Sequence, residues 1–528
     1  MKLRFPLTGI LILCLAASAA GQRRVLDFAQ VTGSNPLLSY ENASLMASLG
    51  KANFSEARVS FAKENGDLIP LEGSPDSWNL NVLTQSFRRV SDRLVFSGKV
   101  GYSFFRGNGM GGQVLMNPRE SAIGFLEEDS STVGVKQREI YTLSGSLSYS
   151  FSRGLSAGVK IDYISADQTK FKDPRFLNML MDLKVAPGIT LWKSSGFVLG
   201  GNLLWHHSVE QLSAGLFGTM DHQYFVLVNQ GGFLGSRELF DGDVGYVSLS
   251  NIRPLTDDGY GLALQIAAGS GTRFYGQIKG LWRDGYYGSR TSTSVVFCEF
   301  NGPEAALETS LIIPRGKDIH KLDLNGGAKI LFNYTNSYSY KTETGMSSVV
   351  VYNGQNKTMS RYRYAAHLGY DLKKNVGGYR PDWEFRISAD ALMQQRKTIL
   401  YPDYRDDSYM NLALDLSAER NIERETGCIS LGASLFGFAG TGNPKTDGSY
   451  SSGSSKVKSF DSWLFRQFEY DTAMRAGGEL SFTWTWLRPR RLAPYLKISD
   501  RFTSLLQTPQ YLDGRFRNTA QVALGCNF

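Results

Sequence analysis

The strictest constraint on this chain is a two-residue alternation of apolar and polar side chains that recurs along most of its length. From Tyr141 to Phe151, every second residue is large and apolar or a glycine, and the residues between are serine or threonine. Neighbouring side chains of a β-strand point to opposite faces, so the pattern predicts a strand with one apolar and one polar face. The alternation resumes after Arg153–Gly154 and runs to Tyr163, which predicts a hairpin.

Several later segments alternate in the same way. A soluble β-sandwich also alternates, but its strands usually run ~5–6 residues. The segments here run about ten residues or more, which is the length that a tilted strand needs to cross a bilayer. The clearest segments cover residues 197–205, 322–334, 362–373, 383–391, 411–419 and 469–486.

Composition excludes several other classes of protein. The 528 residues are 42% hydrophobic, with 56 glycines, four cysteines and a formal net charge of +8. A helical membrane protein would need runs of ~20 apolar residues, which are missing here. Four cysteines are too few for a disulfide-based scaffold, and the abundant aromatic residues argue against wholesale disorder. No dense basic patch interleaved with aromatic residues occurs, so no nucleic-acid partner is expected.

The first residues have the layout of a secretory signal peptide. Lys2 and Arg4 precede an apolar core from Leu7 to Leu15, and small residues follow it. Cleavage is expected between Gly21 and Gln22. Residues 1–21 are therefore the predicted signal peptide, residues 22–92 an N-terminal plug or periplasmic segment, and residues 93–528 the barrel. The 22–92 stretch lacks clean alternation, and an additional strand pair is a further alternative for it.

Connection lengths give an independent reason to expect a transmembrane barrel. Long connections are predicted at residues 106–138, 336–360 and 439–467, and short ones at 153–154, 193–196, 269–272, 421–427 and 488–491. Along the predicted strand order, the short turns fall on one side and the long loops on the other, as in outer-membrane barrels. The predicted fold class is all-β, an antiparallel transmembrane β-barrel of about 14–18 strands with short periplasmic turns, long external loops and a candidate N-terminal plug. The expected location is the outer membrane, with its lipid as a partner.

The last strand carries the most specific local signal. Its apolar face ends at a terminal aromatic residue, as in the assembly signal that the barrel-assembly machinery reads in outer-membrane proteins. The predicted assembly residues are Ala520, Val522, Leu524 and Phe528.

Charged residues that alternate with the apolar face are expected to project into the lumen, because charge on the lipid side costs ~2–4 kcal/mol for Arg or Lys at mid-membrane. Their signs are mixed, so no ion preference follows. The candidate lumen charges are Arg361, Arg363, Glu384, Arg386, Asp390, Asp415 and Glu419.

No catalytic, cofactor or metal site is predicted. His206 and His207 are adjacent on a predicted strand and should point to opposite faces, which disfavours a shared metal. Asp257–Asp258 and Asp406–Asp407 are expected in external loops, where such acids are usually solvated. A hydrolase would need a serine and a histidine aligned on neighbouring strands, which one sequence does not reveal.

Three short motifs resemble an uncharacterised family of outer-membrane barrels of Bacteroidota type, a domain of unknown function. They are Asn35–Pro36, the Gly50–Gly66 element, and the Gly98–Phe105 strand with Asn117–Pro118 in the loop after it. The resemblance implies a companion of TonB-dependent nutrient transporters. The layout is also similar to that of fatty-acid-transporter barrels, which carry an N-terminal plug.

The expected function is a channel or accessory subunit in solute uptake across the outer membrane, with a TonB-dependent transporter as the candidate partner. An enzyme is not expected. The alternatives are a membrane-embedded hydrolase acting on lipid or peptide, and a structural or adhesive barrel that uses its long loops. Pairing of Cys298 with Cys428 is left open.

Overall fold

The computed structural model describes residues 25–50, 53–127, 130–193, 196–217, 223–240, 245–249, 251–342, 347–452, 457–487 and 491–528. The predicted signal peptide and its Gly21–Gln22 cleavage site lie outside these residues. No helix in the described part of the chain is long and apolar enough to cross a membrane.

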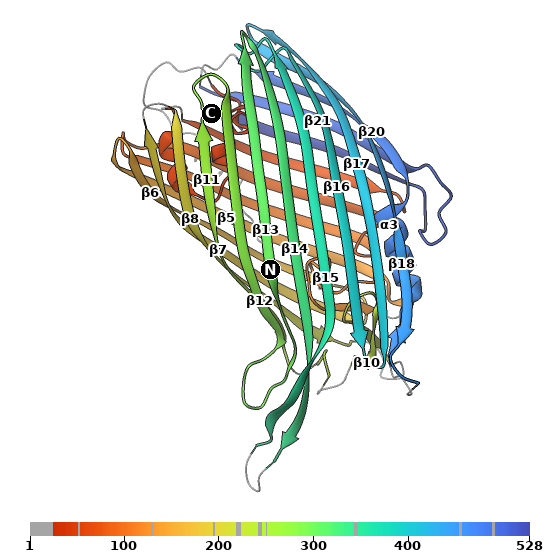
Figure 1. Cartoon of the computed structure of the whole chain (residues 1–528). Coiled ribbons are helices and arrows are strands. Elements are labelled where there is room, and N and C mark those ends of the chain that lie inside the picture. The colour runs from red at the N-terminus through yellow and green to blue at the C-terminus, as the bar shows by residue number, and fades with distance from the viewer. Residues whose placement is uncertain are drawn as a thin grey trace.

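Eighteen antiparallel strands form a closed barrel (Figure 1), at the upper limit of the predicted range. Each strand pairs with the barrel strand next to it in the sequence, and β1 pairs with β22 to close the sheet. The first nine are β1 (Phe54–Asn65), β2 (Asp76–Arg89), β3 (Leu94–Met110), β5 (Gly134–Ser152), β6 (Leu155–Lys170), β7 (Arg175–Lys193), β8 (Phe197–Gly215), β11 (Arg253–Ala268) and β12 (Arg273–Gly288). The others are β13 (Val296–Arg315), β14 (Asp318–Lys341), β15 (Val349–Lys374), β16 (Trp383–Leu400), β17 (Asp403–Arg424), β18 (Gly427–Ser449), β20 (Arg475–Trp486), β21 (Ala493–Leu505) and β22 (Phe516–Asn527).

The remaining elements belong to two groups. The first group precedes the barrel in sequence and consists of α2 (Phe28–Gly33), η1 (Pro36–Leu38) and η2 (Ala43–Ser48). The second group lies in long connections between strands: β4 (Gly124–Glu127), η3 (Ser130–Thr132), β9 (Phe225–Asn229), β10 (Leu234–Leu239), β19 (Lys458–Ser459) and α3 (Asp461–Thr472). Strands β19, β10, β9 and β4 form a separate four-stranded sheet in that order.

The alternation in the sequence becomes the two faces of the barrel wall. Leu203, Leu435 and Leu480 are more than 60% exposed on the outer face. Buried polar residues such as Ser148 and Thr190 point inward. An outer face built of exposed leucine and aromatic side chains is suited to lipid and costly in water.

The two ends of the barrel differ in their connections. Residues 153–154 join β5 to β6 and residues 316–317 join β13 to β14, whereas residues 216–252 join β8 to β11 at the opposite end. We call these ends the short-turn end and the long-loop end. In Figure 1 the short-turn end is at the top, and the β14–β15 hairpin projects from the long-loop end.

Two predicted boundaries need correction. The barrel begins at Phe54 and not at residue 93, because β1 and β2 pair along their whole length and β1 also closes the barrel with β22. The extra strand pair that the sequence left open is therefore present, and, among the described residues, residues 25–50 and Asn53 precede the barrel. Residues 336–360, predicted as a loop, lie mostly in the β14–β15 hairpin, whose strands continue beyond the rest of the wall.

The predicted assembly residues lie at the closing seam. Val522 and Leu524 are exposed on the outer face, and Ala520 lies two residues earlier on the same strand. The backbone of Phe528 is paired with Ser55 by two hydrogen bonds of 2.8 and 3.0 Å. The last residue of the chain thus completes the pairing of β22 with the first barrel strand.

Candidate functional site

The lumen of the barrel contains a cavity of about 770 Å³. Glu41 of the N-terminal segment borders it on the short-turn side, and Asn117, Glu120 and Ser121 of the β3–β5 connection border it on the long-loop side. The rest of its lining comes from the barrel wall. We call this cavity the chamber, residues 25–50 the plug, and the folded connections at the long-loop end the cap.

Charged side chains of the chamber wall occur mostly as pairs. Lys279 lies 3.2 Å from Glu41 of the plug and 3.4 Å from Glu308. Arg283 pairs with Asp257 at 2.5 Å and with Glu304 at 3.2 Å. These pairs compensate each other's charge, so the chamber does not present a field of one sign.

Large apolar side chains also face the chamber, on strands whose inner face is otherwise polar. They put an apolar surface inside a polar lumen, and the chamber is therefore amphipathic. The apolar lining includes Leu180, Leu204, Leu255, Leu281, Phe300 and Leu392.

The plug is held to the wall by buried hydrogen bonds of neutral groups. The amide nitrogen of Asn42 donates to the carbonyls of Ile189 (3.1 Å) and Gly201 (3.3 Å) and to Oε1 of Gln265 (3.0 Å). The hydroxyls of Ser148 and Ser156 donate to the carbonyl of Ser44 at 3.2 and 2.8 Å. Asn42 and Ser44 are each at most 1% exposed. This network fixes the η2 turn against β5, β6, β7, β8 and β11.

Glycines in the wall make room for this contact. A Cβ on Gly188 would lie 2.3 Å from Oδ1 of Asn42, and one on Gly200 would lie 2.9 Å from its Nδ2. A Cβ on Gly158 would lie 2.7 Å from the backbone nitrogen of Ser44. Any side chain at these positions would push the plug away from the wall, so the wall is shaped to receive residues 42–44.

Charged groups hold the other side of the plug. Asp27 pairs with Arg380 at 2.8 Å, and Lys373 donates to the side chain of Gln30 at 2.7 Å. Arg380 belongs to the β15–β16 turn, and burial beside Asp27 and Glu419 leaves its pKa above the ordinary value because the two carboxylates outweigh desolvation. The plug thus touches the wall on both sides of the lumen.

The cap is a folded unit with its own core. Its four-stranded sheet lies over buried apolar residues from the connections and from the adjacent wall, including Val114, Phe125, Val226, Phe240 and Phe297. Burial of these side chains removes apolar surface from water, which stabilises the cap.

Arginines of the wall hold the cap at the β3–β5 connection. Arg361 is buried and donates to the carbonyls of Arg119 (3.2 Å), Glu120 (3.2 Å) and Ser121 (3.1 Å). Glu120 in turn accepts from Arg363 at 2.7 Å and from Lys329 at 3.0 Å. The loop segment between Pro118 and Ser121 is therefore attached to β14 and β15.

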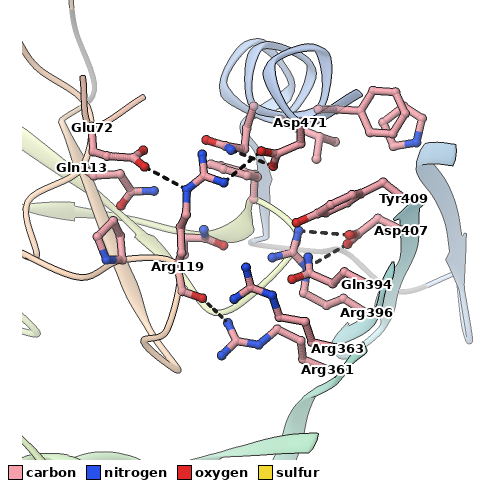
Figure 2. A pocket seen from close by; sticks show the side chains of 17 residues that line it. Glu72, Gln113, Arg119, Arg361, Arg363, Gln394, Arg396, Asp407, Tyr409 and Asp471 are labelled. Carbon is pink, nitrogen blue, oxygen red and sulfur yellow. Dashed lines mark hydrogen bonds and ion pairs between the residues drawn. The ribbon is translucent and has the colours of Figure 1, made fainter. Parts of the chain in front are cut away.

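Figure 2 shows the small cavity of about 90 Å³ beside this attachment. Arg119 reaches between Glu72 at 2.8 Å and Asp471 of α3 at 2.9 Å, and Arg396 forms two hydrogen bonds with Asp407. The four guanidinium groups in Figure 2 belong to Arg119, Arg361, Arg363 and Arg396. Each is bonded to a carboxylate or to backbone carbonyls. Arg119 joins three connections of the cap to one another, and Arg361 and Arg363 join the β3–β5 connection to the wall.

The ionisation of Glu120 follows from these contacts. Burial alone would raise its pKa, but the charges of Lys329, Arg363 and Arg361 hold the pKa below the ordinary value. Glu120 is therefore a carboxylate at neutral pH, and its attachment to the wall depends on that charge.

The predicted lumen charges are found in three places: at the cap, at the plug, and on the wall between them. Arg361 and Arg363 contact the cap, while Glu384 accepts a hydrogen bond from Gln30 of the plug and Glu419 lies 3.2 Å from Arg380. Arg386 pairs with Asp371, and Asp390 pairs with His367 at 2.7 Å. Asp390 and Asp415 border a second lumenal cavity. Sequence reasoning did not find Asn42, Ser44, Arg119 or Glu120, because their partners are more than 100 residues away in most cases.

The histidine and aspartate pairs differ from the sequence-based expectation in one respect. Asp257–Asp258 and Asp406–Asp407 lie in strands β11 and β17 and not in external loops. His206 contacts Asp182 in the chamber wall at 2.7 Å, and His207 contacts Asp258 at 2.7 Å, stacked beside the exposed Trp205. The two rings thus point to opposite faces, as strand geometry requires. The described residues contain no group of three potential metal ligands.

Cys298 and Cys428 are free thiols and do not pair. They lie on β13 and β18, with four other strands between them in the sheet.

The fold is that of an outer-membrane-type barrel whose lumen contains a plug and a cap. The chain belongs to a family of unknown function (DUF6850), whose model matches residues 43–528. The match begins at Ala43, the first residue of η2, and includes the whole barrel.

Known structures and sequences add little to this assignment. No curated protein matches the chain. It is similar to the ferric preacinetobactin receptor BauA of Acinetobacter baumannii, with 8% identity, 91% of this chain and 80% of that chain covered, and a TM-score of 0.40. The outer membrane transporter YddB of Escherichia coli is 8% identical, with 90% of this chain and 81% of that chain covered and a TM-score of 0.43. A FadL homologue of Pseudomonas aeruginosa is 11% identical, with 94% of each chain covered and a TM-score of 0.33. Such distant likeness carries no argument about function.

Proposed function

We propose that this protein is an outer-membrane channel that takes up a small solute through a chamber closed by the plug on one side and the cap on the other. The observation that carries the proposal is the lumenal chamber of about 770 Å³, which the plug borders on one side and the cap on the other. A structural barrel has no need of an interior cavity with paired charges and an apolar lining. A chamber of this size lies in the range of small-molecule sites.

The two closures are expected to act in series. Release of the cap would connect the chamber to the long-loop side, and release of the plug would connect it to the short-turn side. By the usual rule of short periplasmic turns, the cap faces the cell exterior and the plug faces the periplasm.

Swelling of proteoliposomes in an uncharged sugar tests this proposal. Four proteins are compared: the full mature chain, a variant lacking residues 22–50, a variant in which a short Gly-Ser linker replaces residues 113–133 of the cap, and the combination of both changes. We expect slow swelling for the first three and fast swelling for the combination, because two closures in series must both open. Resistance of each folded barrel to SDS without heating controls for assembly. A folded combined variant that still excludes the sugar would contradict the proposal.

Location is tested separately by membrane fractionation. Deletion of Phe528 removes the residue that completes the seam with Ser55, so we expect less protein in the outer membrane and more periplasmic degradation. Unchanged outer-membrane levels would count against this assembly role.

A partnership with a TonB-dependent transporter is supported by the family resemblance of the sequence motifs. Purification from gently solubilised membranes tests it. A stoichiometric complex with such a transporter would make this barrel an accessory subunit, and a monomeric barrel that conducts by itself would favour direct passage.

A further inference from the structure

A second lumenal cavity, of about 370 Å³, lies along β16, β17, β18, β20 and β21. One side of it carries Asp390 and Asp415, and another carries Arg475 and Arg501. An adjoining cavity shares Asp415 and Arg501 and extends to Lys373 and Glu384 near the plug. These side chains therefore border a path along the lumen.

The floor between the acidic and the basic side chains is aromatic. Phe436 on β18 is in register with Asp415 on β17 and with Gly477 on β20. A Cβ on Gly477 would lie 2.4 Å from Cζ of Phe436, so the missing side chain lets the phenyl ring extend across β20. The Arg501 guanidinium lies over this ring, 4.1 Å from its centroid.

The arginines are held by aromatic rings more than by carboxylates. Arg475 lies 3.8 Å from the ring centroid of Phe438, and its Nη1 donates to the carbonyl of Tyr470. The carboxylate of Glu479 is 3.8 Å from Arg501, well beyond the ~2.7–2.9 Å of a charge-assisted hydrogen bond. The Arg501 side chain is 49% exposed, which leaves guanidinium N–H groups directed to the lumen.

The acidic side is also incompletely paired. Asp390 has His367 as a partner, and its side chain is 58% exposed. Asp415 has no ion-pair partner among the residues that the structure describes. Across the strands of this wall, the cavity thus presents first a carboxylate, then an aromatic ring and then a guanidinium group.

We propose that this cavity binds a zwitterionic solute about the size of a dipeptide, with its ammonium group at Asp390 and Asp415 and its carboxylate at Arg501 and Arg475. The Phe436 ring would contact the apolar part between the two charges. A dipeptide is at most about 7 Å long. The backbones of β17 and β21 are three strand spacings apart, roughly 14 Å, and the Arg501 side chain extends into this space and shortens the distance that the solute must span. This inference rests on the proposed uptake function and names the class of its solute.

Binding of three forms of one probe tests the proposal without requiring transport. The probes are glycyl-phenylalanine, its N-acetyl form without the ammonium charge, and its C-terminal amide without the carboxylate. Isothermal titration with the full mature chain in detergent is expected to give at least tenfold tighter binding of the zwitterion than of either blocked form. Equal affinity for all three forms, or no binding of any, would overturn the proposal.

Variants assign each charge to its residue. Arg501→Gln should abolish the preference for the free dipeptide over its amide, and Asp415→Asn should abolish the preference over the N-acetyl form. Arg501→Lys should retain part of the preference, since it keeps the charge but loses the planar stacking. Asp92→Asn and Arg153→Gln, both in short turns, serve as matched controls that keep the wild-type ratios. The assignment would be overturned if a control variant lost both preferences. It would also be overturned if Arg501→Gln and Asp415→Asn both kept the wild-type preferences.

The result also separates this inference from the proposed function. If the zwitterion binds but the variant with both plug and cap altered excludes the sugar, the binding site is supported and the channel function is contradicted. If that variant passes the sugar but the protein binds the three dipeptide forms equally, the channel function is supported and the binding site is contradicted.

Discussion

The plug and the cap close the same lumen with different chemistry. The centre of the plug contact is a set of buried hydrogen bonds between neutral groups around Asn42 and Ser44, set against glycines of the wall. The cap is attached through carboxylates and guanidinium groups around Arg119 and Glu120. Neutral buried hydrogen bonds respond little to pH or salt, whereas partly exposed ion pairs such as those of the cap respond to both. The two closures should therefore open under different conditions.

The largest effect is expected from filling the space beside the plug. In Gly188→Val, the new Cβ would lie 2.3 Å from Oδ1 of Asn42, so the plug cannot keep its position. We expect complete cleavage of residues 25–50 by an added protease, while the barrel stays resistant. Gly145→Val is the matched control, because nothing lies within 4 Å of a Cβ at Gly145. A protected plug in Gly188→Val would show that the glycine niche does not position it.

Removal of the Asn42 amide should have a smaller effect. Asn42→Ala loses three buried side-chain hydrogen bonds to the wall and leaves their partners there unsatisfied, and it also loses the two that its Oδ1 accepts from Ser44. We expect the plug contact to weaken by about 2–3 kcal/mol, which is about a 30- to 150-fold loss of hydrogen-exchange protection in residues 43–48. Asn356→Ala in the exposed β14–β15 hairpin should leave that protection unchanged. Equal protection in both variants would refute a role for Asn42 as an anchor.

Neutralising one cap residue should have a modest effect. Glu120→Gln removes pairs with Lys329 and Arg363, but the Glu120 side chain is 32% exposed and solvent screens the pairs. A loss of about 1 kcal/mol, or about fivefold faster exchange in the β3–β5 connection, is expected. Glu425→Gln in the β17–β18 turn is the control. Slower or unchanged exchange in Glu120→Gln would argue that the cap core alone holds the loop.

Acid should loosen the cap before the centre of the plug. The pKa of Glu120 is below its ordinary value in the folded protein, so its contribution is present above the unfolded pKa of about 4.3 and is lost as pH falls through the lower folded value. Below about pH 4, protection of residues 113–121 should fall, after correction for the intrinsic exchange rate. Residues 43–48 should change less, since Asn42 and Ser44 do not titrate. Simultaneous loss in both segments would remove the distinction between the closures.

The strand pattern was the most predictable part of this protein. A period of two residues follows directly from backbone geometry, and burial against lipid fixes which parity is apolar. Tyr141–Phe151, the lumen-facing Arg361 and Arg363, and the terminal Phe528 could therefore be interpreted without contacts. Residues 54–89 were missed from the sequence because their outer face is less uniformly apolar, with Ser55, Lys63 and Thr84 interrupting the pattern.

The closures and both cavities depended on the tertiary structure. Asn42 meets Gln265 across 223 positions of sequence, and Arg361 meets Glu120 across 241, so no local pattern marks these partners. Gly188 and Gly477 look like ordinary glycines of alternating strands until a plug or a phenyl ring is seen to occupy the space above them. By itself, the sequence determined a barrel wall, because strand periodicity is a local property of the backbone. The contacts that fill the lumen were decided by the tertiary structure, because barrel closure brings distant inward side chains into one interior.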